Sequence, residues 1–219
     1  MLVTSRSFEE YEAFFALTAG DLAGSVLDCS AGASGFAAVA NARGGRVIAV
    51  DPAYALGVDR LAAEVDASTA AGGAIIAGNA DSFVWTWYGS RERRDELRRD
   101  AGAAFLADLR AHPGTYVPGA LPALPFADDA FDLALCSHLL FTWSDVLDEA
   151  WHEDALTELL RVAREVRVFP LVVQGTGDPV PFLPPLVERL RDLGHTADVV
   201  AVPYEFQRGA DRMLTVRRR

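Results

Sequence analysis

The chain has 219 residues, 51% of them hydrophobic, and a formal net charge of −11 at pH 7, which fits one globular domain with a full core. The negative charge argues against a nucleic-acid backbone as the main partner, because phosphate binding needs a basic face. All 20 basic residues are arginines, and the absence of lysine excludes a phosphate-binding P-loop, a Schiff-base enzyme and a Tyr-x-x-x-Lys dehydrogenase.

The first part of the chain predicts alternating helices and strands. Ser7 to Glu10 has the Ser-x-x-Glu pattern of a capping box, which opens an amphipathic helix to about Leu17. The next expected elements are a strand at 25–29, a helix at 34–43, a strand at 46–50 and a helix at 55–69. The glycine pairs at 44–45 and 72–73 are expected to end the two later helices.

The region from 74 to 113 is longer than an ordinary crossover between neighbouring strands. It holds an aromatic cluster, which includes Trp85, Trp87 and Tyr88, and a charged helix from about 90 to 110. We interpret this region as an insertion that helps to shape a substrate pocket. Its aromatic residues, with Trp143, predict either a substrate wall or core packing. The arginines of 91–99 alternate with acids at i,i+4 spacing, which favours a solvated, self-paired face.

The second half of the chain continues the alternation and ends in a hairpin. Expected in order are strands at 115–117 and 130–136, a helix at 148–163, a strand at 165–170, a helix at 184–193, and strands at 197–202 and 212–216. No helix fits between the last two strands, so they should be antiparallel. The whole chain, 1–219, therefore predicts one α/β domain: a Rossmann-like, seven-stranded mixed sheet with helices on both faces and an antiparallel C-terminal hairpin.

The chain lacks the sequence signals of export, of a membrane span and of a metal site. Its N-terminus has no long apolar stretch, and no run approaches the ~20 apolar residues that cross a bilayer. Neither Cys29 and Cys136 nor the four histidines have zinc-site spacing. We therefore expect a cytoplasmic protein with a small-molecule substrate, no metal, and no membrane or nucleic-acid partner.

Two acids stand at the ends of the first two strands. Asp28 precedes the small residues 30–35, and Asp51 closes the second strand. In a Rossmann-like sheet, small residues let the backbone approach an adenosine cofactor, and the second acid accepts hydrogen bonds from the ribose. We predict that Asp51 is the ribose ligand, against the alternative of a turn acid before Pro52. Asp28 is predicted to orient the first loop through backbone amides, or else to be a solvated turn residue.

Several motifs carry a resemblance to a known family. They are residues 26–34 with Asp51, the Leu-Pro-Phe and Phe-Asp stretch of 124–133, Ser137 to Leu140, and the helix residues 159–164. Together with the element order, they resemble the class I S-adenosylmethionine-dependent methyltransferases over nearly the whole chain. The sequences of residues 135–141 and 162–170 are similar to those of an uncharacterised bacterial subgroup of this family. Of the family's three alternate glycines only Gly32 remains, with Ser30 and Ser34 at the other two positions.

The resemblance implies S-adenosylmethionine as cofactor and a set of cofactor-binding residues. These are Asp28, Ser30, Ala31, Gly32, Asp51, Pro52, Gly119, Ala120, Cys136 and Ser137. His138 follows the fourth strand and is the candidate general base; it could instead line the methionine end or be a packed loop residue. Cys136 could alternatively be a small buried strand-end residue. Arg6 and Tyr11 are candidates for closing over the cofactor carboxylate.

Three functions follow from these residues. The first is an S-adenosylmethionine-dependent methyltransferase that acts on a small-molecule acceptor. The second is a non-catalytic cofactor-binding or regulatory member of the same fold, whose altered glycine loop no longer supports catalysis. The third is an NAD-binding dehydrogenase, suggested by residues 32–35 and opposed by the missing Tyr-x-x-x-Lys pair and the terminal hairpin.

Overall fold

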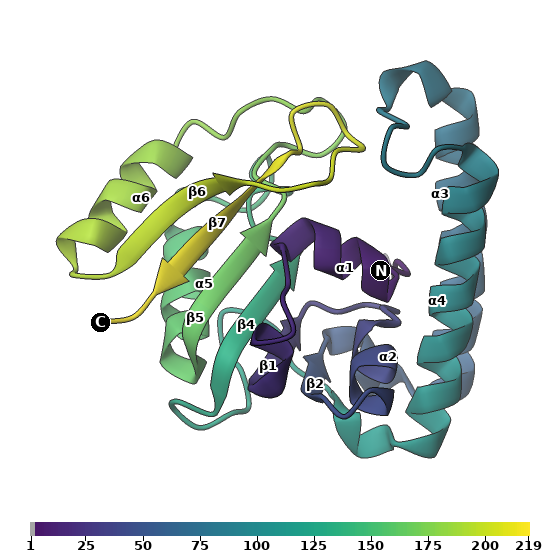
Figure 1. Cartoon of the computed structure of the whole chain (residues 1–219), viewed down its shortest axis with the longest axis horizontal. Coiled ribbons are helices and arrows are strands. Elements are labelled where there is room, and N and C mark those ends of the chain that lie inside the picture. Colours follow the sequence, from purple (N-terminus) through teal and green to yellow (C-terminus); the bar gives the residue numbers. More distant parts are fainter. Residues whose placement is uncertain (1–2) are drawn as a thin grey trace.

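A seven-stranded sheet forms the centre of the molecule, in the order β3-β2-β1-β4-β5-β7-β6 (Figure 1). The computed structural model describes residues 3–219. The strands are β1 (Ser25–Cys29), β2 (Arg46–Val50), β3 (Tyr116–Val117), β4 (Phe131–Ser137), β5 (Ala163–Phe169), β6 (Thr196–Ala201) and β7 (Arg212–Arg217). The first five strands are parallel, and β7 lies antiparallel between β5 and β6. This arrangement confirms the predicted fold class and the predicted antiparallel hairpin, and it is the class I methyltransferase topology that the sequence resembles.

Helices cover both faces of the sheet and bury two separate cores. They are α1 (Phe8–Phe15), α2 (Phe36–Ala42), α3 (Val58–Gly78), α4 (Arg91–Ala111), α5 (Glu149–Val162) and α6 (Leu183–Asp192). Residues of α1 to α4 share one buried cluster, for example Phe14, Phe36 and Phe105. Residues of α5 and α6, such as Leu156 and Leu186, share the other. Within residues 3–219, no helix is both long enough and apolar enough to cross a membrane.

The α3–α4 region differs from the sequence prediction. Helix α3 does not end at the glycine pair 72–73 but continues to Gly78, and α4 runs back beside it (Figure 1). Glycine inside a helix costs about 1 kcal/mol relative to alanine. Packing offsets this cost, because Leu61, Val65 and Ile76 of α3 are buried in the same cluster as Phe105 of α4. Tertiary contacts therefore extend a helix that local propensity alone would end.

The N-terminal helix α1 is fixed by its predicted capping box. The Glu10 amide donates to Ser7 Oγ at 3.2 Å, and the Ser7 amide donates to Glu10 Oε2 at 2.7 Å. At the other end, Arg167 of β5 donates to the Phe15 carbonyl at 2.9 Å and pairs with Asp21 at 2.6 Å. These contacts hold α1 across the sheet (Figure 1) and place residues 4–6 beside the loop that follows β1.

Candidate functional site

A cavity of about 510 Å³ lies at the carboxyl ends of the parallel strands. Its volume is in the range typical of small-molecule sites, and it is located where open α/β sheets bind ligands, because the strand order reverses between β1 and β4. The sheet side of the cavity is lined by residues that follow four strands: Ser30, Gly32, Asp51, Pro52, Ala120, Leu121, Ser137 and His138. Seven of the predicted site residues are thus brought together, along with Leu121, which was not predicted.

Asp51 is held at the cavity wall by two backbone amides. Its Oδ2 accepts from Gly32 N at 3.0 Å, and its Oδ1 accepts from Ala53 N at 2.8 Å. Burial raises the pKa of this carboxyl, and the two amide hydrogen bonds act in the opposite direction. A carboxylate oxygen can accept more than one hydrogen bond, so both oxygens remain able to accept from hydroxyl groups of a ligand. Its predicted role as ribose ligand stays a prediction.

The amides of the loop after β1 are largely used within the protein. Six consecutive amides, from Ala31 to Phe36, each donate within the protein. Their acceptors are the carbonyls of Val50, Thr4, Ala31 and Arg6, the Asp51 carboxylate and the Ser34 hydroxyl. A dinucleotide site needs such amides for its pyrophosphate. The loop therefore suits a nucleoside ligand without phosphate.

The turn keeps a glycine-like backbone although two glycines are replaced. Ser30 has φ +58° and Gly32 has φ +56°, both in the left-handed region. A non-glycine residue there costs roughly 1–2 kcal/mol, so Ser30 stores strain at the cavity wall. Gly32 has a further constraint, because a Cβ atom would lie 3.0 Å from the Thr4 carbonyl oxygen.

Four predicted cofactor residues do not line the cavity. Ala31 is buried and donates to the Val50 carbonyl at 3.2 Å. Gly119 lies against Val50 and Pro125, whose side-chain atoms a Cβ would approach to 2.8–2.9 Å. Cys136 is fully buried next to Cys29 in the β1–β4 register, within the core that α5 and α6 cover. It is thus a buried strand-end residue.

Asp28, the fourth of these residues, is fully buried. Its Oδ1 accepts from the Tyr11 hydroxyl at 2.9 Å, and its Oδ2 has no partner within residues 3–219. The expectation that Asp28 orients the loop through backbone amides is therefore wrong. Tyr11 is buried with it and does not reach the cavity.

The buried Asp28 predicts an unusual pH dependence of stability. Burial raises its pKa from 3.8 to about 8, so the folded protein keeps a proton that the unfolded chain releases above pH 4. Stability should fall as pH rises from about 4 to about 8, by up to about 1.4 kcal/mol per pH unit. The Asp28→Asn variant removes this titration, so urea denaturation should show its advantage over the wild type growing with pH. An advantage that stays constant between pH 5 and pH 8 would contradict a protonated Asp28.

His138 lies at the end of β4 with its backbone in the left-handed region, φ +57°. Its amide donates to the Phe169 carbonyl at 2.7 Å, and its Nδ1 is 2.7 Å from Ser137 Oγ. Burial, and then the charge of Arg6, holds the imidazole pKa well below 6.5. His138 is therefore neutral at pH 7, which leaves a ring nitrogen able to accept a proton. Its ring also packs against Phe14 and Phe169, so its position is compatible with each of the three predicted roles: general base, lining of the methionine end and packed loop residue.

The rest of the cavity lining contains residues that the sequence did not identify as site residues. They are Thr4, Ser68, Phe83, Arg94, Arg98, Trp151, Phe169, Gln174, Tyr204, Phe206 and Gln207, among others. Sequence spacing favoured a solvated face for the α4 arginines, and Arg91 does pair with Asp95 at 3.5 Å. However, Arg94 is only 8% exposed, and it lines the cavity. Its guanidinium lies over the ring of Phe206, in the C-terminal hairpin, with 5.4 Å between Cζ and the ring centroid. No local sequence pattern signals this contact.

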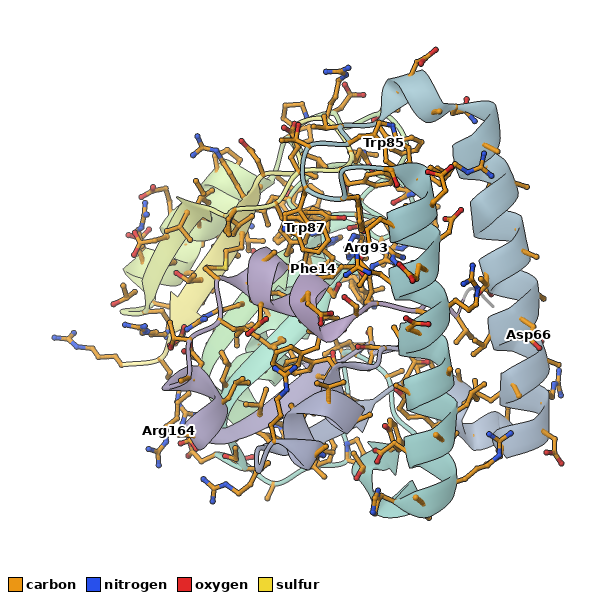
Figure 2. All side chains as sticks on the ribbon, turned by 45° about the vertical axis from the view of Figure 1, so that its right-hand side comes forward. Phe14, Asp66, Trp85, Trp87, Arg93 and Arg164 are labelled. Carbon is orange, nitrogen blue, oxygen red and sulfur yellow. The ribbon has the colours of Figure 1, made fainter. Side chains whose placement is uncertain are left out.

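The aromatic residues for which the sequence predicted either a substrate wall or core packing divide between these two roles. Trp143 lines the cavity. Trp85 and Trp87, labelled in Figure 2 in the segment between α3 and α4, instead pack edge-on against Phe206 and Tyr204, at 5.2 and 5.1 Å between ring centroids. These two tryptophans therefore pack against the residues that line the cavity and do not line it themselves.

Comparisons with known proteins give distant similarities. No protein-family model matches the chain. The uncharacterized protein MJ0045 of Methanocaldococcus jannaschii is 25% identical over 218 residues, which cover 99% of this chain and 96% of that protein. The similarity thus includes the α3–α4 region.

Similar solved structures include three described as methyltransferases. A SAM-dependent methyltransferase from Aquifex aeolicus is 15% identical, with 89% of this chain and 81% of that chain covered and a TM-score of 0.45. Magnesium protoporphyrin IX methyltransferase from Synechocystis is 13% identical, with 91% and 73% covered and a TM-score of 0.47. A putative RNA methyltransferase from Pyrococcus horikoshii is 12% identical, with 91% and 75% covered and a TM-score of 0.46.

Proposed function

We propose that this chain, which has the class I methyltransferase topology, binds S-adenosylmethionine and transfers its methyl group to a small-molecule acceptor. The observation that carries the proposal is the position of Asp51. Its carboxylate lines the cavity directly after β2, and the amides of Gly32 and Ala53 fix both of its oxygens. No cation pairs with Asp51 among residues 3–219, so its remaining acceptor capacity is available to ribose hydroxyls.

The residues present fit the other parts of this cofactor. The loop from Ala31 to Phe36, with its amides already bonded, suits a nucleoside without phosphate. Arg6 lines the same cavity, its charge acts on His138, and within residues 3–219 it makes no ion pair with a carboxylate. It is therefore the residue we assign to the methionine carboxylate. Ala120 and Leu121, after β3, provide an apolar edge for the adenine ring.

In the mechanism, the chain acts mainly by positioning. S-adenosylmethionine, when bound, supplies an electrophilic methyl group whose bonding electrons return to sulfur on transfer. Asp51 and Arg6 fix the two ends of the site, while Trp143, Phe169 and Phe206 exclude water from the space beside it. The neutral imidazole of His138 can accept a proton from an acceptor hydroxyl or amine.

Titration calorimetry with S-adenosylmethionine, S-adenosylhomocysteine and NAD separates the candidate functions. We expect both sulfur nucleosides to bind with micromolar to submillimolar affinity and NAD not to bind. Failure of both sulfur nucleosides to bind at millimolar concentration would favour the second candidate function, a non-catalytic or regulatory member of the fold whose cofactor loop has diverged. Binding of NAD alone would favour the dehydrogenase.

A further inference from the structure

We propose that the methyl acceptor is a molecule with a flat, apolar body and a carboxylate group, and that Arg94 of α4 binds this carboxylate group. The inference rests on the proposed function and specifies the class of its substrate. It concerns the end of the cavity opposite the sheet, which is built by α3, α4 and the loop between β6 and β7.

Arg94 is a buried guanidinium whose hydrogen-bonding capacity is mostly unused. Only 8% of the residue is exposed, and it lines the cavity. Its Nη1 donates to Asp95 Oδ1 at 2.6 Å, whereas its buried Nε has no partner within residues 3–219. A guanidinium binds a carboxylate best through two parallel N–H groups, and only Nη1 of Arg94 donates a hydrogen bond within residues 3–219. An unpaired buried polar group is costly, which favours a ligand that satisfies it.

The charges at this end of the cavity favour an anion. Arg94 and Arg98 of α4 line it. Glu10 pairs with Arg98 at 2.7 Å, whereas Asp95, the partner of Arg94, also pairs with Arg91 at 3.5 Å. Three arginines of α4, namely Arg91, Arg94 and Arg98, thus share two carboxylates, which leaves one positive charge in a protein whose net charge is −11. A single carboxylate would balance it.

The walls next to Arg94 are aromatic and flat. Phe206 lies under its guanidinium at 5.4 Å and stacks on Phe83, with 4.5 Å between ring centroids and 8° between ring planes. Tyr204, Phe169 and Trp143 continue the cavity lining. Gly72 of α3 faces this space without a side chain, and a Cβ atom there would meet no other atom within 4 Å, which leaves room for a planar group. An aromatic body with one carboxylate matches both the walls and the charge.

The test compares two ligands of equal shape and different charge, 1-naphthoate and 1-naphthamide. Their affinities are measured by calorimetry with saturating S-adenosylhomocysteine, whose own binding is measured first. We expect naphthoate to bind at least about tenfold more tightly than naphthamide. Arg94→Gln should abolish this preference and leave the affinity for S-adenosylhomocysteine unchanged. Arg93→Gln is the matched control, because Arg93 (Figure 2) is the preceding residue of α4 and its side chain is 56% exposed.

The outcomes separate this inference from the function on which it rests. If S-adenosylhomocysteine binds but naphthoate shows no preference over naphthamide, or neither binds, the carboxylate acceptor is refuted and the cofactor proposal stands. A preference that survives Arg94→Gln refutes the role of Arg94. If S-adenosylhomocysteine does not bind, the proposed function fails, and the acceptor proposal fails with it.

Discussion

Asp51→Asn should lower the affinity for S-adenosylhomocysteine by about 10- to 100-fold, because the variant loses the charged acceptor of the ribose hydroxyls. Hydrogen bonds to a charged group contribute about 1.5–3 kcal/mol each. Asparagine has nearly the same shape, but its NH₂ group would face either the Gly32 amide or the Ala53 amide, and it can accept neither from that amide nor from a ribose hydroxyl. Calorimetry on the wild type and the variant measures the effect.

Two controls test whether a loss of affinity in Asp51→Asn comes only from the change in net charge or from a loss of folding. Asp59→Asn, at an exposed position near the start of α3, changes the net charge equally and should leave the affinity unchanged. Circular dichroism and urea denaturation establish that Asp51→Asn still folds, since it also weakens the cap on Ala53. A folded Asp51→Asn protein with wild-type affinity would show that the ligand does not contact this carboxylate.

Glu10→Ala should lower the free energy of unfolding by about 3–5 kcal/mol, because it leaves a buried guanidinium without its counter-charge. Glu10 has no exposed surface, and its Oε1 accepts from Arg98 Nε at 2.8 Å and from the Tyr88 hydroxyl. Its Oε2 accepts from the Ser7 amide at 2.7 Å, so the capping box is lost as well. For a chain of this length the melting temperature should fall by about 10 °C.

The neighbouring residue Glu9 provides the matched control for Glu10. It lies in the same first turn of α1, is exposed, and should cost less than about 1 kcal/mol when changed to alanine. The double variant Glu10→Ala with Arg98→Met should recover part of the lost stability, because it removes the uncompensated charge. A Glu10→Ala loss no larger than that of Glu9→Ala would show that this ion pair does not join α1 to α4.

The fold was predictable because its signals are local. Alternating apolar segments predict the strands, and the short interval around Arg208 and Gly209 predicts the antiparallel hairpin that the structure confirms. The end of α3 was not predictable, since its continuation past Gly72 depends on packing against α4. Local propensity describes a helix in isolation, whereas its length in the protein is set by what it buries.

The site was predictable on the sheet side and not on the opposite side. Asp51, Gly32 and His138 follow strands, and the carboxyl ends of parallel strands meet at one edge. Arg94 meets Phe206 across more than a hundred residues of sequence, so no spacing signals their contact. Asp28 also matches the family pattern in sequence, but its burial against Tyr11 depends on tertiary packing, which the sequence pattern does not show.

A crystal structure of the protein with S-adenosylhomocysteine tests the central claim most directly. The account predicts density for the nucleoside in the cavity, with both ribose hydroxyls within hydrogen-bond distance of the Asp51 carboxylate and the amino-acid end near Arg6 and Ser137. Density for the ligand elsewhere, or a ribose that contacts no oxygen of Asp51, would contradict it.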